Sequence, residues 1–214
     1  ELKKNKGSTS LKFREKMSRL AFGETAYYDA VISNYFNKFN NINFPKRKIL
    51  FTNLVENLRY GENPHQIGAF YSQNMENKLE QIHGKTLSYN NYSDIFAALT
   101  ISKSLPKNTG TAIVKHGNPC GVSALKNNLD SYKSALESDP ISAFGGIISC
   151  NYKITQKLAL ILNKIFLEVI VADGFEKKAL KILKSKKNLR LIDSSKITFN
   201  EIWKFNSVDN FTLI

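Results

Sequence analysis

The amino-acid sequence predicts an α/β fold, a three-layer αβα sheet that is preceded by a helix. Two observations lead to this prediction. Short apolar runs rich in Val and Ile, such as Thr111–Lys115 and Val169–Ala172, indicate strands of a buried sheet. Between such runs lie stretches of about a dozen residues with helical character, and this alternation is typical of α/β folds.

The first part of the chain predicts one long amphipathic helix and then a linker. Between Lys12 and Phe39 the apolar residues recur every three to four positions, as they do on one face of a helix. Residues 40–47, with the sequence NNINFPKR, are rich in Asn and contain a Pro. We therefore place a domain boundary there, between residues 1–46 and residues 47–214.

The remaining elements follow the linker in order. Strand Ile49–Val55 ends at an Arg-Tyr-Gly turn, and strand Gly68–Tyr71 leads into an irregular loop. From there helices and strands alternate along the chain, as a three-layer sheet requires. They are helix Tyr92–Leu105, strand Thr111–Lys115, helix Leu129–Glu137, strand Gly146–Ser149, helix Thr155–Phe166, strand Val169–Ala172, helix Glu176–Lys186 and strand Leu189–Leu191.

Composition narrows the class of protein. Of the 214 residues 42% are hydrophobic and 23% are charged, which is ordinary for a globular enzyme that buries a core. No stretch approaches the roughly 20 apolar residues of a membrane span, and no apolar signal segment opens the chain. Two cysteines do not make a disulfide framework, which favours a reducing compartment. We expect a cytoplasmic protein without membrane contact.

The net charge of +13 raises the possibility of nucleic-acid binding. The lysines are scattered, and their densest run, Lys177–Lys187, falls on a predicted helix without accompanying Arg or aromatic residues. We therefore expect no specific nucleic-acid partner. The charge still favours anionic substrates.

The most informative motif is Lys-His-Gly-Asn-Pro-Cys-Gly at residues 115–121, directly after a predicted strand. The strand delivers Lys115 and His116 to its carboxyl end, where α/β sheets place ligands, and a tight Asn-Pro/Gly loop follows. His116 can take a proton near neutral pH, and Lys115 can stabilise negative charge. As neighbours on a strand they should face opposite ways unless the loop re-aims one of them. Taken alone, a His near a turn is more often a capped surface or core residue.

Two further turn-rich motifs accompany it. Arg59 and Tyr60, in the sequence LRYGENPHQ, offer a guanidinium fork and a phenol that suit phosphate oxygens. Gly145 and Gly146, in DPISAFGG, let backbone N–H groups approach a ligand closely. Each motif alone is also compatible with an ordinary turn.

In this order and spacing the motifs resemble one family, the bifunctional purine-synthesis enzymes with AICAR transformylase and IMP cyclohydrolase activities. The matching blocks are LRYGENPHQ (58–66), LSYNNYSDIFAAL (87–99), IVKHGNPCGV (113–122), DPISAFGGII (139–148) and EVIVADGFEKKALKIL (168–183). Residues 22–36, FGETAYYDAVISNYF, resemble the helix that closes the cyclohydrolase half. The resemblance implies a cytidine-deaminase-like fold, the first of two copies in the full transformylase domain.

The resemblance also implies the reaction and the site. The 5-amino group of AICAR attacks the formyl carbon of the co-substrate 10-formyltetrahydrofolate, giving formyl-AICAR and tetrahydrofolate. His116 would be the base and Lys115 would stabilise charge, while Arg59 and Tyr60 would hold the phosphate. The further substrate contacts implied are Asn91 to the ring, Gly145 through its backbone and Glu168 to the ribose hydroxyls, although Glu168 also fits a surface position at a strand edge.

Zinc is not expected. Zinc deaminases pair a His or Cys with Pro-Cys-x-x-Cys. Here Pro119-Cys120 is followed by Ser123, and Cys150 is isolated, so we predict no metal site and assign Cys120 to a loop. A Ser hydrolase is equally unsupported, because the sequence contains no Gly-x-Ser-x-Gly elbow.

Family members are more than twice as long as this chain, so we expect a fragment. It would hold the end of the cyclohydrolase domain with its linker (1–46) and the N-terminal half of the transformylase domain (47–214). The resemblance implies a homodimer for the full enzyme and a folate site formed mostly by its C-terminal half. Two alternatives stay open: a non-catalytic nucleotide-binding or structural module, and a basic nucleic-acid-binding domain.

Overall fold

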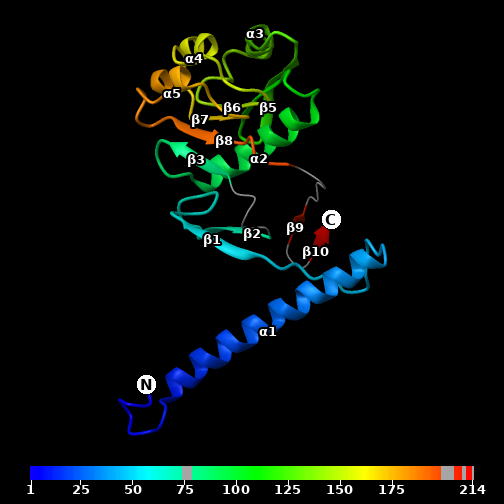
Figure 1. Ribbon diagram of the computed structural model, residues 1–214, viewed down its shortest axis with the longest axis vertical. Coiled ribbons are helices and arrows are strands. Elements are labelled where there is room, and N and C mark those ends of the chain that lie inside the picture. The colour runs from blue at the N-terminus through cyan, green and yellow to red at the C-terminus, as the bar shows by residue number, and fades with distance from the viewer. Residues whose placement is uncertain (74–78, 199–204, 209–210, 214) are drawn as a thin grey trace. The chain divides into compact units, whose positions relative to one another are not determined.

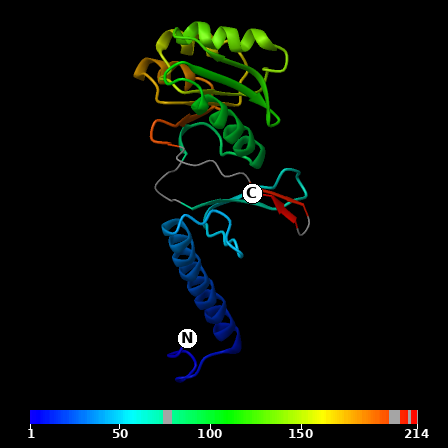
Figure 2. The ribbon, with the colours of Figure 1, turned by 90° about the vertical axis from the view of Figure 1, so that its right-hand side faces the viewer.

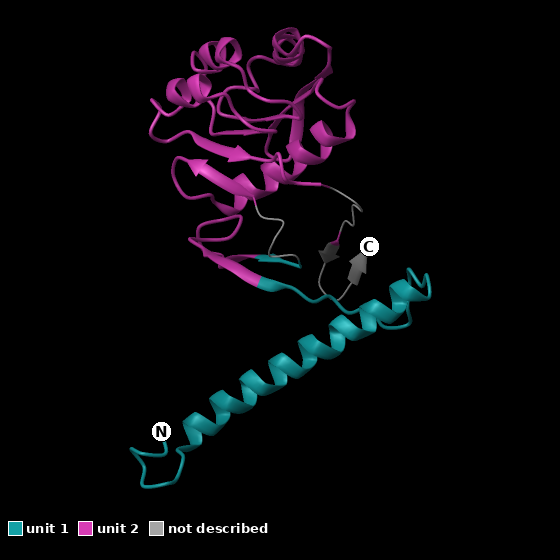
Figure 3. Cartoon of the chain, viewed as in Figure 1, with its two compact units in different colours: residues 1–53, 71–73 teal, residues 54–70, 74–214 magenta. Residues whose placement is uncertain are grey.

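A computed structural model describes residues 1–73, 79–198, 205–208 and 211–213. The chain divides into two compact units, residues 1–53 with 71–73, and residues 54–70 with 74–214 (Figure 3). Within the described residues, no helix combines the length and the apolar character that crossing a membrane requires.

Unit 1 is dominated by helix α1, Leu11–Phe39. Its N-cap Ser10 accepts a hydrogen bond from the Phe13 N–H, and Asn40 is the C-cap, so the helix lies close to the predicted bounds. The segment after the helix contacts it at Tyr27. The Tyr27 hydroxyl accepts a hydrogen bond from Asn53 Nδ2 at 3.0 Å, and the Tyr27 ring packs edge-on against Phe51. Ala30 is the one residue of α1 that is buried.

Unit 2 is built on a six-stranded sheet with the strand order β3-β8-β7-β6-β4-β5 (Figure 1). Strands β6, β7 and β8 run parallel, whereas β4 is antiparallel to both of its neighbours. The strands are β3 (Glu80–His83), β4 (Gly110–Lys115), β5 (Asn118–Ala124), β6 (Ile147–Cys150), β7 (Val169–Ala172) and β8 (Arg190–Asp193). The sheet is therefore mixed.

Helices cover both faces of this sheet (Figures 1 and 2). Helices α3 (Asn128–Ser138), α4 (Gln156–Leu162) and α5 (Lys177–Leu183) share one apolar core with the sheet. Helix α2 (Tyr89–Ser104) packs on the opposite face, where alternate residues of the same strands form a second core. Both faces of the central strands are thus buried, which explains why the sequences of these strands are unbroken apolar runs. The arrangement is compatible with the predicted three-layer αβα fold.

Four elements were not predicted. Strands β3 and β5 form the two edges of the main sheet, and β9 (Asn206–Val208) pairs with β10 (Phe211–Leu213) as an antiparallel hairpin. Strands β1 (Asn53–Leu58) and β2 (Gly68–Ser72) pair with each other, with β1 beginning four residues later than expected. Part of the irregular loop expected after Tyr71 lies outside the described residues.

Candidate active site

The Lys-His-Gly-Asn-Pro-Cys-Gly motif of residues 115–121 forms a tight hairpin between β4 and β5. Lys115 pairs with Asn118, and the two residues between them have positive φ angles, 53° at His116 and 74° at Gly117. Type I′ turns require this conformation at both central positions. The turn is therefore His-Gly, and the expected Asn-Pro/Gly loop was wrong, because Asn118 and Pro119 already belong to β5. The turn re-aims His116 away from the strand alternation.

A left-handed backbone at a residue other than glycine costs about 1–3 kcal/mol, so His116 needs support. Asp94 of α2 supplies it. The carboxylate Oδ1 accepts from the Gly117 N–H at 2.6 Å, and Oδ2 accepts from the His116 N–H at 3.2 Å. Asn118 adds a third contact by donating from Nδ2 to the His116 carbonyl at 3.0 Å. Asp94 and Asn118 therefore both stabilise the turn, while His116 itself stays exposed to solvent.

Lys115 connects this turn to the loop that carries Gly145. Its Nζ donates to the Phe144 carbonyl at 2.8 Å, which leaves further N–H donors of the ammonium free for a ligand. Gly145 has a φ of 74° and donates its own N–H to the Phe166 carbonyl at 2.9 Å. A backbone contact from Gly145 to a ligand would therefore use its carbonyl.

The same loop begins at Asp139, whose side chain accepts from the Ser142 N–H at 2.9 Å. Hydrogen bonds from Ser142 lower the pKa of this carboxyl from its ordinary value. Asp139 thus stays ionised at neutral pH and stabilises the turn that leads to Gly145.

Glu168 lies next to this loop and joins it to α2. Its N–H donates to the Gly146 carbonyl at 3.1 Å, and its carboxylate Oε2 accepts from Asn91 Nδ2 at 2.9 Å. Arg190 approaches the same oxygen at 3.9 Å. Glu168 is half-buried, so the unpaired Oε1 remains available to a hydroxyl group.

Asn91 is only 5% exposed. Its Oδ1 accepts from the Ser88 N–H at 3.2 Å, which closes a capping box at the start of α2, and its Nδ2 is used by Glu168. Contact between Asn91 and a substrate ring would require the amide to exchange one of these partners. In the described structure Asn91 orients Glu168.

Arg59 and Tyr60 line a pocket of about 230 Å³ together with Arg190, and Lys85 adds a third positive charge to its wall. Thr86, Leu87 and Ser88 complete the lining. The Arg59 guanidinium lies 5.8 Å from the centre of the Tyr60 ring. Three cations around one hollow favour an anionic group such as a phosphate.

The segment that carries Arg59 is tied to α2 by an aromatic and hydrogen-bonded contact. Tyr92 donates its hydroxyl to the Glu56 carboxylate and stacks on Phe70 with ring centres 4.4 Å apart. Burial, helped by the Glu56 charge, raises the pKa of Tyr92. The phenol therefore stays protonated and keeps donating to Glu56.

Lys115, Glu168 and Arg190 lie at the same end of the strands of the main sheet. Lys115 ends β4, yet β4 is antiparallel to β6, so Lys115 lies level with the amino ends of the parallel strands β6, β7 and β8. Glu168 and Arg190 belong to these amino ends. The rule that ligands bind at carboxyl ends applies to parallel sheets and does not transfer to this mixed one.

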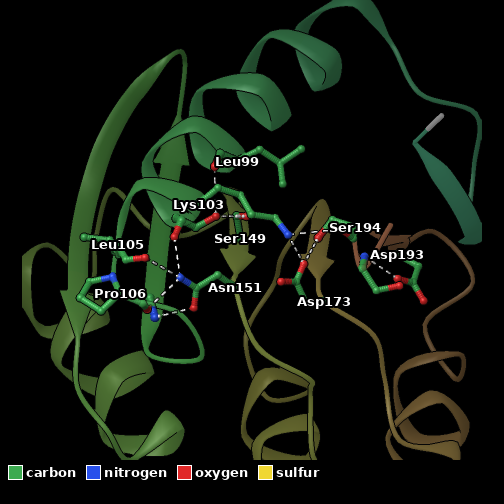
Figure 4. Close-up of polar contacts among 12 residues, drawn as sticks. Leu99, Lys103, Leu105, Pro106, Ser149, Asn151, Asp173, Asp193 and Ser194 are labelled. Carbon is green, nitrogen blue, oxygen red and sulfur yellow. Dashed lines mark hydrogen bonds and ion pairs between the residues drawn. The ribbon is translucent and has the colours of Figure 1, made fainter. Parts of the chain in front are cut away.

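The carboxyl ends of β6, β7 and β8 carry a network of polar side chains instead (Figure 4). Lys103 of α2 donates to Asp173 at 2.5 Å and to the Ser194 carbonyl at 3.3 Å, and Ser194 Oγ donates to Asp173 at 2.8 Å. Asn151 donates to three carbonyls at the end of α2. Ser194 and Asn151 are buried, so this end of the sheet is closed by structural contacts.

Both cysteines are free thiols, Cys120 half-buried and Cys150 buried. The described residues contain no group of three or more His, Cys, Asp or Glu side chains that could hold a metal ion. Cys120 is the extra residue of a bulge in β5, not a loop residue as expected. Burial, together with the Asp139 charge, raises the pKa of its thiol, which disfavours a nucleophilic thiolate.

Sequence reasoning missed three residues of this region, Asp94, Lys85 and Arg190. Asp94 is 22 residues before His116, and only the packing of α2 beside the hairpin brings them together. Lys85 and Arg190 reach the Arg59 pocket from separate strand ends. The one available signal was the acidic Asp94 in the first half of a predicted helix that otherwise lacks acidic residues.

Comparison with known proteins identifies the family of this chain. A sequence profile of the AICARFT/IMPCHase bienzyme matches residues 1–214. The chain belongs to this family. It is 44% identical over 193 residues to a bifunctional purine biosynthesis protein PurH from Thermoanaerobacter sp. (strain X514), covering 88% of this chain and 38% of that relative. A PurH of the same description from Aquifex aeolicus (strain VF5) is 42% identical over 195 residues, covering 89% and 38%. The chain thus spans well under half the length of these family members.

Proposed function

We propose that this chain is the central part of a bifunctional purine-synthesis enzyme. Residues 1–46 would be the end of the IMP cyclohydrolase domain and its linker, and residues 47–214 the N-terminal half of the AICAR transformylase domain. The family match over residues 1–214 supports the assignment to such an enzyme. The mixed sheet with helices on both faces is compatible with the first of two cytidine-deaminase-like copies.

The proposed reaction is formyl transfer from 10-formyltetrahydrofolate to the 5-amino group of AICAR. An aromatic amine conjugated with a carboxamide is a poor nucleophile, so its proton must leave as the new C–N bond forms. His116 accepts that proton. Lys115 stabilises the negative charge that develops on the formyl oxygen. The bond between the formyl carbon and the folate nitrogen then breaks, and that nitrogen takes up one proton in place of the one that His116 accepted from the amine, so that tetrahydrofolate is released.

One observation carries this proposal, namely a continuous series of contacts that joins the predicted residues. Lys115 contacts the Phe144 carbonyl, and two residues later the Gly146 carbonyl contacts the Glu168 N–H. The Glu168 carboxylate lies 3.9 Å from Arg190, which lines the Arg59 pocket. A base, a fixed cation, a free carboxylate oxygen and a cationic pocket along one edge suit a ribonucleotide that carries a reacting amine.

The roles in binding follow from this order. Arg59 and Tyr60 hold the phosphate, Glu168 accepts hydroxyl protons of the ribose, and Gly145 contacts the substrate through its backbone. The folate would be bound mostly by the C-terminal half of the domain, and the active enzyme would be a homodimer. The alternative, a non-catalytic nucleotide-binding module, predicts AICAR binding without any formyl transfer.

The test is His116→Ala in the full-length protein. We expect formyl transfer to fall about 100- to 10,000-fold, as loss of a general base does. The IMP cyclohydrolase activity of the same preparation is an internal control for folding and should be unchanged. Formyl transfer at the wild-type rate by this variant would refute the role of His116.

A further inference from the structure

Asp94 contacts the proposed catalytic turn but has no role in the reaction proposed above. It lies in the second turn of α2 and is half-buried. Both of its carboxylate oxygens are used by the hairpin, Oδ1 by the Gly117 N–H at 2.6 Å and Oδ2 by the His116 N–H at 3.2 Å. A single side chain therefore holds the two residues whose backbone is left-handed.

The direction of the His116 side chain depends on this contact. The Cα–Cβ bond of a turn residue is fixed by its φ and ψ, and a left-handed His is less stable than an extended one unless other groups impose the conformation. Hydrogen bonds to an ionised carboxylate are about twice as strong as those between neutral groups. Two of them, accepted from adjacent N–H groups, favour the left-handed turn over its alternatives.

We propose that Asp94 is a positioning residue for formyl transfer, which fixes the turn so that the His116 imidazole faces the 5-amino group of the substrate. This inference rests on the proposed function of His116. The carboxylate acts through the backbone and does not touch the substrate. Because α2 also carries Asn91, which orients Glu168, one rigid helix sets both the base and the proposed ribose contact.

The rate measurement uses Asp94→Ala and Asp94→Asn in the full-length protein. An Asn retains one acceptor oxygen, but its NH₂ group cannot accept from the second N–H. We expect kcat for formyl transfer to fall about 10- to 100-fold for Asp94→Ala and by a smaller factor for Asp94→Asn, as for misplaced catalytic groups. KM for AICAR should change less than about twofold, since the binding contacts stay in place. Asp130→Asn, an exposed Asp on α3, is the matched control and should keep the wild-type kcat.

A double substitution tests whether Asp94 acts through His116. In a His116→Ala background, Asp94→Ala should lower the residual rate by less than about twofold, because there is no imidazole left to orient. A 10- to 100-fold loss in that background as well would mean that Asp94 acts elsewhere and would overturn the proposal.

Amide hydrogen exchange gives a readout without catalysis. In Asp94→Ala the Gly117 and His116 amides should exchange at least about tenfold faster than in the wild type, with an intermediate rate in Asp94→Asn. Unchanged protection would overturn the positioning role even if activity fell. If His116→Ala instead proved fully active, the proposed base would be wrong while the exchange data still reported whether Asp94 holds the turn, so the two failures are distinguishable.

Discussion

Asn151 should be among the most sensitive positions for stability in unit 2, although it lies at the opposite end of the strands from the candidate site. It is 3% exposed. Its Oδ1 accepts from the Gly110 N–H at 2.7 Å, and its Nδ2 donates to the carbonyls of Ser102, Pro106 and Leu105 at 2.8, 3.1 and 3.2 Å (Figure 4). The side chain therefore joins the end of α2 to the start of β4.

The cost of Asn151→Ala can be worked from these partners. The Ser102 carbonyl keeps a second donor in the Leu105 N–H, and the Pro106 carbonyl keeps Thr109. The buried Gly110 N–H loses its partner, which costs about 1–3 kcal/mol, and the lost bonds to the carbonyls add about 1 kcal/mol. We expect the free energy of unfolding to fall by about 2–4 kcal/mol, a large part of the roughly 5–15 kcal/mol of a typical domain.

Urea denaturation followed by circular dichroism measures this change. Asn188→Ala, at an exposed Asn, is the matched control and should lie within about 0.5 kcal/mol of wild type. Asn151→Asp keeps the acceptor for Gly110 but turns a carboxylate oxygen toward the three carbonyls. The loss in free energy of unfolding of Asn151→Asp relative to wild type should become smaller as the pH falls toward 4, where the carboxyl gains a proton to donate. A loss from Asn151→Ala no larger than that of the control would refute the reasoning.

Three further predictions concern the close contact of β5 with α3, the Arg59 pocket and alkaline pH. Gly121→Ala would place a Cβ 1.8 Å from the Ala135 carbonyl oxygen, so we expect at least about 3 kcal/mol of destabilisation; an unchanged urea midpoint would contradict this contact. Arg59→Ala should weaken AICAR binding about 10- to 100-fold by calorimetry and affect the dephosphorylated nucleoside much less; equal losses would exclude Arg59 as the phosphate ligand. Burial raises the pKa of Cys150 from 9.0 to about 12, and that of Tyr132 from 10.0 to about 12. The unfolded chain releases these protons first, so the contribution of the two groups to stability should be constant below pH 9 and then fall by up to about 1.4 kcal/mol per pH unit and group until pH 12. Cys150→Ala should show a shallower fall in alkaline urea titrations.

The central part of the fold was predictable because burial on both faces leaves a strong local signal. Val169–Ala172 was predicted with the observed bounds of β7, and β4 began one residue before the predicted Thr111. The missed strands β3 and β5 lie at the edges of the sheet, where one row of partners is absent and polar residues are tolerated. Their sequences, EQIH and NPCGVSA, contain no apolar run.

The direction of the strands was not predictable from periodicity, and this affected the site. Apolar runs do not tell whether a strand runs parallel or antiparallel, so the sequence did not show that the carboxyl end of β4 lies beside the amino end of β6. Lys115 and Glu168 both contact the loop that carries Gly145, Lys115 through its Nζ to the Phe144 carbonyl and Glu168 through its N–H to the Gly146 carbonyl. The contact of Asp94 with the turn could not be predicted from the sequence, because it depends on the packing of a helix against a hairpin.

The bulge at Cys120 has a consequence for how the protein behaves among other chains. Strand β5 is the outer strand of the main sheet and so presents a row of backbone groups to solvent. Pro119 offers no N–H, and the extra residue at Cys120 breaks the even spacing that an incoming strand would need. Both irregularities make β5 a poor template for edge-to-edge aggregation.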